Sequence, residues 1–152
     1  MLCKRFKTLA LVLFTGLALT ACGGVDPNSP LGLRQALFKQ MLHTSEELGG
    51  MLRGRIAFNE ADFIAGSAKL DRLAEQPWQH FPKFKEEDHT RAKEEVWQRQ
   101  ERFQELARAL EASTAALRDA SLVSPLHSAA LAAPMQRVED SCKACHKEFR
   151  AF

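Results

Sequence analysis

The sequence predicts an all-α fold, an antiparallel up-down-up-down bundle of four helices in one domain. Three observations support this prediction. Apolar residues recur at intervals of three and four along four long segments, which is the period of an amphipathic helix. No segment shows the apolar–polar alternation that is typical of a strand. The length, 152 residues, suits a single domain with a substantial core.

Residues 1–21 have the features of a secretory signal peptide. Lys4, Arg5 and Lys7 form a basic start, an apolar run follows over residues 9–19, and small residues come next. The apolar run is shorter than the ~20 residues that a membrane-spanning helix needs. Without residues 1–21 the formal net charge changes from +2 to −1, so charge gives no reason to expect nucleic-acid binding.

The end of this segment, Leu19-Thr20-Ala21-Cys22, resembles a bacterial lipobox, in which the cysteine becomes the lipidated first residue. The alternative is an ordinary signal peptide that is cut near Ala21. We expect residues 22–30 to tether the domain to a membrane surface without spanning the membrane. Gly23 after the cysteine favours the outer membrane by analogy, on the periplasmic side of a Gram-negative envelope.

The first two helices are expected over residues 31–53 and 59–76. Ser29-Pro30 is a typical helix start, Asn59 is a candidate N-cap, and Pro77 ends the second helix. The residues expected to face inward are Leu33, Leu37, Met41, Leu48 and Leu52 in the first helix, and Ala61, Ile64, Ala65, Ala68 and Leu73 in the second, flanked by Phe63 and Leu70.

Residues 77–88 are the long connection, which Trp78, Phe81 and Phe84 are expected to fold back onto the bundle. The third helix is expected over residues 90–120, because no Gly or Pro interrupts them. Its inward positions are Trp97, Phe103, Leu106, Leu110, Thr114 and Leu117.

The fourth helix is expected over residues 125–150, after Ser124-Pro125. Pro134 lies inside it, so either the helix is kinked there, or the main helix begins near Pro134 and a shorter helix precedes it. Met135, Val138, Cys142, Cys145 and Phe149 are spaced by three and four residues, which places both cysteines on the apolar stripe.

Cys142-Lys-Ala-Cys145-His146 has the C-x-x-C-H spacing of a c-type haem attachment site. A structural zinc site is one alternative, with His43, His80, His89 or His127 as the fourth ligand. A redox-active dithiol is another, but such pairs are expected at a helix N-terminus that follows a strand. A plain disulfide within a helical turn would be geometrically awkward. An exported domain with one cysteine pair is not a disulfide-stapled scaffold.

The chain resembles the class II c-type cytochromes, the cytochrome c-prime family, over residues 31–152. Three stretches carry the resemblance: residues 142–150, with the Cys, Cys, His and Arg of the family motif; Leu33-Arg34-Gln35-Ala36; and Pro77-Trp78-Gln79-His80-Phe81, with Trp97 following. The resemblance implies a four-helix bundle with one covalent haem c, thioethers at Cys142 and Cys145, and His146 as an axial iron ligand.

The resemblance also places Arg34 and Arg150 close to the haem. Arg34 would meet a propionate, and the alternative is a solvated surface arginine. Low-spin members have a methionine ligand four residues after the first-helix arginine, where this chain has Phe38. The iron is therefore expected to be five-coordinate and open to small gases. The alternative is that Met41, one turn further on, reaches the iron; otherwise Met41 fills the core.

We therefore predict an exported, lipid-anchored monohaem cytochrome that serves in electron transfer and whose iron binds small gases. One alternative is a dedicated NO- or CO-binding or scavenging protein, and another is a haem-free structural lipoprotein. The expected partners are redox proteins, diatomic gases and a membrane surface, with a homodimer through the first two helices as an option. No enzymatic activity is expected.

Overall fold

The computed structural model describes residues 24–85 and 90–151. Its elements are α1 (Pro30–Leu52), α2 (Glu60–Ala74), the 3-10 helix η1 (Trp78–His80), α3 (Glu95–Gln98), α4 (Gln100–Ser121) and α5 (Ser128–Phe149). Within the described ranges there is no strand, and no helix is long and apolar enough to cross a membrane. The predicted signal peptide, Cys22 and His89 lie outside the described residues.

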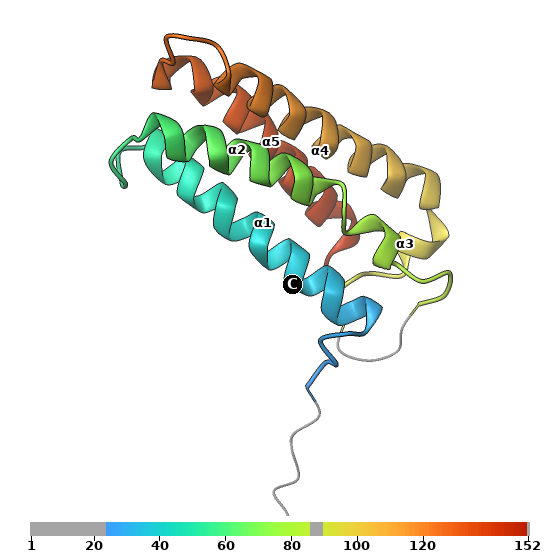
Figure 1. Cartoon of the computed structure of the whole chain (residues 1–152). Coiled ribbons are helices and arrows are strands. Elements are labelled where there is room, and N and C mark those ends of the chain that lie inside the picture. Colours follow the sequence, from blue (N-terminus) through green and yellow to red (C-terminus); the bar gives the residue numbers. More distant parts are fainter. Residues whose placement is uncertain (1–23, 86–89, 152) are drawn as a thin grey trace, which may run out of the picture.

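The four long helices run antiparallel to their neighbours and form one bundle (Figure 1). In the bundle α2 packs against α1 and α4, and α5 packs against α4 and α1. A large apolar cluster fills the space between them, formed by Met41, Leu48, Phe63, Leu70, Leu73, Ala74, Leu110, Leu117, Leu131, Met135 and Val138. The predicted four-helix bundle is confirmed.

Helix α1 begins as the sequence predicts, but its buried face differs from the prediction. The Ser29 hydroxyl accepts a hydrogen bond from the Gly32 amide at 3.0 Å, and Pro30 occupies the first turn. Met41 and Leu48 are buried, whereas Leu33 is 39% exposed, so its inward assignment was wrong. Arg34 takes the buried position next to Leu33, because the segment after η1 covers this side of the helix and supplies hydrogen-bond acceptors.

Helix α2 is capped by Asn59, whose side chain accepts a hydrogen bond from the Asp62 amide at 3.1 Å. The predicted inward face was wrong for Ala61 and Ala65, which are exposed. Phe63 and Leu70, which the prediction placed at the flanks, are fully buried. Burying these large side chains removes more apolar area from water than burying alanines, so they set the rotation of the helix.

The predicted third helix, residues 90–120, is interrupted in the structure. Residues 90–92 are not helical, and Arg99 separates α3 from α4 with φ −124° and ψ 51°. Two backbone hydrogen bonds hold the first part against the end of α5, from Lys93 N to Phe149 O at 2.9 Å and from Ala151 N to Arg91 O at 2.8 Å. These contacts compete with helix formation and replace its first turn.

Helix α5 begins at Ser128, three residues after the predicted start, with His127 in the N-cap position. The helix continues through Pro134, which is buried, so the alternative that it begins near Pro134 was wrong. The predicted apolar stripe is confirmed, since Met135, Val138 and Phe149 are all buried.

Candidate functional site

The two cysteines of the motif lie in the last turns of α5, on its inward side. Both are free thiols and both are partly buried. Cys142 packs against the large apolar cluster, whereas Cys145 packs against a second cluster at this end of the bundle, formed by Val96, Phe103, Leu106 and Phe149. The thiols therefore bridge two apolar regions.

Both thiols are held in the protonated form. Burial raises the pKa of Cys142, and burial together with the neighbouring Cys142 raises the pKa of Cys145 to about 11. A redox-active C-x-x-C pair needs the opposite, a pKa lowered toward neutrality. The raised pKa values therefore argue against the dithiol alternative. The apolar surroundings suit thiols that form a bond to an apolar vinyl group.

His146 follows directly, one helical turn after Cys142, and is exposed to solvent. Partial burial of the imidazole lowers its pKa, and the nearby Arg150 lowers it further. The ring is therefore neutral at pH 7 and keeps a nitrogen lone pair, which an iron ligand requires. Within the described residues no three His, Cys, Asp or Glu side chains gather as a metal site, so the zinc alternative has no support there.

Arg34 of α1 is buried, with 3% of its surface exposed. Its guanidinium donates hydrogen bonds to the His80 carbonyl at 3.0 Å and to the Thr90 hydroxyl at 3.3 Å. It also lies over the Phe81 ring, 4.7 Å from the ring centroid. The alternative of a solvated surface arginine was wrong. Arg150, in contrast, is exposed.

A chain of aromatic rings connects α1 with α5. Phe38 contacts Trp78, with centroids 5.9 Å apart, and Phe81, at 6.5 Å. Trp78 contacts Phe103 at 5.8 Å, and Phe103 contacts Phe149 at 5.3 Å. The connection between α2 and α3 thus folds back onto the bundle through Trp78 and Phe81, as predicted. The prediction was wrong for Phe84, which is 83% exposed and lies away from this chain of rings.

The two distal candidates have different surroundings. Phe38 is half-buried and belongs to the aromatic chain, whereas Met41 is 6% exposed and belongs to the large apolar cluster. The core-filling role of Met41 is therefore already satisfied in this structure. Whether either side chain faces the iron stays a prediction.

The indole of Trp78 provides a test of whether a haem fits here. Trp78 contacts both apolar clusters, and its buried Nε1–H has no acceptor among the described residues. A buried donor without a partner is costly, so an absent group with acceptor atoms is a natural explanation. A haem carries two carboxylates and a broad apolar plane, and the thiols, the neutral imidazole and this donor fit such a group.

Glu148 forms an ion-pair cluster that sequence reasoning missed. Its carboxylate accepts hydrogen bonds from Arg102 at 2.8 Å and from Arg99 at 3.0 Å, which ties the end of α5 to α4. The Arg102 guanidinium lowers the pKa of Glu148. The sequence gives no sign of this cluster, because Glu148 lies more than forty residues from Arg99 and Arg102.

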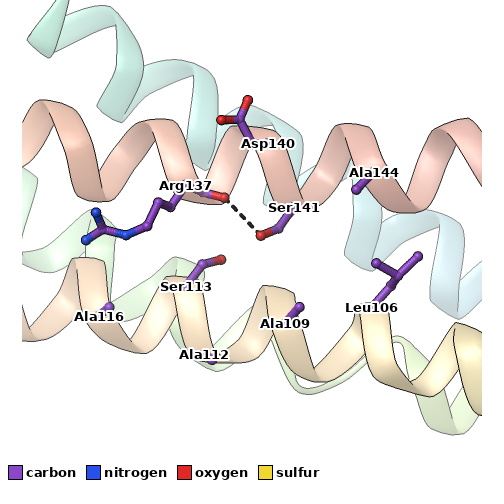
Figure 2. Close-up of a pocket in the computed structure, with 9 residues that line it drawn as sticks. All are labelled: Leu106, Ala109, Ala112, Ser113, Ala116, Arg137, Asp140, Ser141 and Ala144. Atoms are coloured by element: carbon purple, nitrogen blue, oxygen red, sulfur yellow. Dashed lines mark hydrogen bonds between the residues drawn. The ribbon is translucent and has the colours of Figure 1, made fainter.

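A shallow groove of about 510 Å³ lies between α4 and α5 (Figure 2). Its lining is dominated by small side chains: Leu106, Ala109, Ala112, Ser113, Ala116, Arg137, Asp140, Ser141 and Ala144. The Ser141 hydroxyl donates to the Arg137 carbonyl at 2.9 Å. Ala144 and His146 are two residues apart and so point to nearly opposite sides of the helix. The groove therefore faces away from His146, although its Leu106 also belongs to the cluster against which Cys145 packs.

An antiparallel helical bundle with a C-x-x-C-H motif on the inward face of its last described helix defines the class of c-type haem proteins. The family model described as Cytochrome C' matches residues 29–150. The chain belongs to the Cytochrome C' family. Members of this family bind one covalent haem c, and this is the cofactor of the chain.

Solved structures of this family share the fold. Cytochrome c prime from Shewanella frigidimarina is 24% identical, with a TM-score of 0.78 over 86% of this chain and 100% of that chain. A nitric oxide complex of a mutant cytochrome c prime from Alcaligenes xylosoxidans is 23% identical, with a TM-score of 0.74 over 86% and 99%. Cytochrome c' from Rubrivivax gelatinosus is also 23% identical, with a TM-score of 0.73 over 82% and 98%. A search of curated proteins found no match.

Proposed function

We propose that this chain is an exported electron-transfer cytochrome whose iron is five-coordinate and accepts small gases. In this proposal Cys142 and Cys145 hold the haem through thioethers, and His146 is the axial ligand. The bound haem supplies an iron that cycles between Fe(II) and Fe(III). The observation that carries the proposal is the position of two free, half-buried thiols that pack against the two apolar clusters, with His146 directly after them at the surface.

The chain's own residues define the two sides of the site. His146 offers its lone pair from the exposed side of α5. Arg34 is a buried cation near the connecting segment, where it suits a carboxylate of the haem edge. Phe38 presents an aromatic ring with no lone pair, so it excludes bulky ligands without coordinating the iron. We infer no enzymatic activity from this arrangement.

A dedicated gas-binding role is the second candidate. It is favoured by the nitric oxide and carbon monoxide complexes solved for variants of the Alcaligenes xylosoxidans protein. The two roles differ in what reacts with the iron, a partner protein or a diatomic gas. The haem-free lipoprotein alternative has no support, since the family binds haem c.

One spectroscopic experiment tests the proposal. Expressed together with haem-attachment machinery, the protein should show a Soret band that survives denaturation, because the link is covalent. A broad high-spin spectrum of the reduced protein is expected if Phe38 forms the distal wall. A Soret band that is lost on denaturation would contradict the attachment sites.

Replacing His146 with Ala tests the axial ligand separately. The covalent Soret band should remain, because both thioethers are intact, while the position of the band and its response to CO should change. Glu47→Ala is a suitable control, since Glu47 is exposed on α1 and forms an exposed pair with His43. A His146→Ala protein with the parent spectrum would contradict the assignment.

A further inference from the structure

Two cations of α5, and a third in the C-cap position that follows it, lie near His146 on the surface. Lys143 lies three residues before it, Lys147 one residue after it, and Arg150 four residues after it. Residues three apart are neighbours on a helix, so Lys143 lies beside His146, and Arg150 is close enough to lower the pKa of His146. All three cations are exposed, with 71% of the Lys143 side chain accessible.

The segment before α3 adds two more cations at the same place. The backbone of Arg91 and Lys93 pairs with the end of α5 through an isolated bridge between Ala92 and Arg150. The Lys93 ammonium also donates to the carbonyls of Lys147 and Glu148, both at 3.3 Å. We name Arg91, Lys93, Lys143, Lys147 and Arg150 the cationic rim.

Within residues 24–85 and 90–151, the nearby acids do not neutralise this rim. Glu148 is engaged by Arg99 and Arg102, and Arg102 also pairs with Glu105, so this cluster is neutral as a whole. Asp140 lies 3.7 Å from Lys143, across an exposed pair of little energetic weight. Glu94 pairs with Lys85. Because the chain without residues 1–21 carries a net charge of only −1, this positive charge is concentrated locally and opposes the overall sign.

We propose that the cationic rim is the docking surface for an acidic redox protein, which it guides to the His146 side of the site. The inference rests on the proposed function and adds the kind of partner. In each encounter one electron passes between the partner and the iron, so that one is oxidised as the other is reduced. A local field of this kind accelerates encounters with anionic partners and weakens as salt screens it.

The first experiment measures the rate at which small charged oxidants take the electron from the reduced holoprotein. Ferricyanide is the anionic probe and tris(phenanthroline)cobalt(III) is the cationic one, and each accepts one electron from Fe(II). The rate constant with ferricyanide should fall as ionic strength rises from about 0.01 to 0.15 M, where the screening length shrinks to about 8 Å. The rate constant with the cobalt complex should rise.

Charge reversal identifies the surface. Lys143→Glu combined with Lys147→Glu should lower the ferricyanide rate constant at low salt by about tenfold, the lower end of known steering effects. The matched control, Arg55→Glu with Lys69→Glu, makes the same charge change at exposed positions in the α1–α2 loop and on α2. It should change the ferricyanide rate constant less than about twofold. Poly-glutamate should slow the parent reaction, and poly-lysine should not.

The possible outcomes distinguish a failure of this inference from a failure of the proposed function on which it rests. Protein without covalent haem would overturn both. The docking surface alone would be overturned if the haem-bearing parent's ferricyanide rate constant did not change with ionic strength. The same conclusion would follow if the two double variants changed that rate constant equally. The docking surface would also be overturned if a rim variant lost binding to phosphatidylglycerol vesicles but kept the parent's ferricyanide rate constants. The cations would then bind a lipid surface and not a redox protein.

Discussion

Phe38 and Met41 lie one helical turn apart on α1, and they differ in how deeply they are buried. Met41 is enclosed by the large apolar cluster and is needed there as a filler, whereas Phe38 is half-buried among Trp78 and Phe81. A side chain at the edge of the core is easier to place against a planar group than one at its centre. We therefore expect Phe38 to form the distal wall.

Two substitutions separate these residues. Met41→Leu should leave the reduced spectrum unchanged and cost less than about 1.5 kcal/mol of stability, because the two side chains have similar volumes. Phe38→Met should convert the broad high-spin spectrum into sharp low-spin bands, because it supplies a thioether. Low-spin bands in the parent that vanish in Met41→Leu would show that Met41 is the ligand.

Removing the ring of Phe38 tests the distal wall directly. Phe38→Ala should speed CO binding to the reduced protein, measured by flash photolysis, because it opens space beside Trp78. Phe84→Ala is the control, since Phe84 is almost fully exposed. Equal CO association rates in Phe38→Ala and the parent would place the wall elsewhere.

At the scale of elements, a buried carboxylate joins α2 to α4. Asp71 is buried and accepts hydrogen bonds from the Thr114 hydroxyl at 3.2 Å and from the Arg118 guanidinium. Asp71→Ala should lower the free energy of unfolding by about 2 kcal/mol, because it leaves Thr114 without this acceptor and Arg118 without its buried partner. The measurement is chemical denaturation of the haem-loaded protein.

Asp119 provides the comparison, since it binds the same arginine from an exposed position. Asp119→Ala should change stability by less than about 0.5 kcal/mol, as expected for an exposed pair. If both substitutions have the same effect, burial does not set the strength of this ion pair.

The elements show what periodicity can and cannot predict. It predicted α1, α2, α5 and the inward position of both thiols, because each depends on local spacing. It missed the break at Arg99, where no Gly or Pro gives a signal, and it missed the non-helical residues 90–92, because they pair with the end of α5. The burial of Arg34 was missed for the same reason, since its acceptors lie in another segment.

The candidate site divides in the same way. The motif itself could be read from Cys142, Cys145 and His146, because their chemistry depends on spacing within one helix. The unsatisfied indole of Trp78 and the Glu148 ion-pair cluster could not be read, because they depend on which side chains meet in space. No pattern in the sequence marked either of them.

At the scale of the whole molecule, export and lipidation are tested by labelling. Cells grown with labelled palmitate should incorporate it into the parent protein, and a Cys22→Ala variant should not, because the thiol is the expected acceptor. Cys3→Ala should have no effect, since Cys3 lies within the predicted signal peptide. Persistent labelling of the Cys22→Ala protein would contradict the lipobox.

The order of the helices along the chain affects how the protein is assembled. Helix α5 follows the other three and contributes Leu131, Met135 and Val138 to the large apolar cluster, so the bundle lacks one wall until α5 has been made. The thiols are carried by that same wall. The core can therefore close only when the helix that carries the attachment motif joins the bundle.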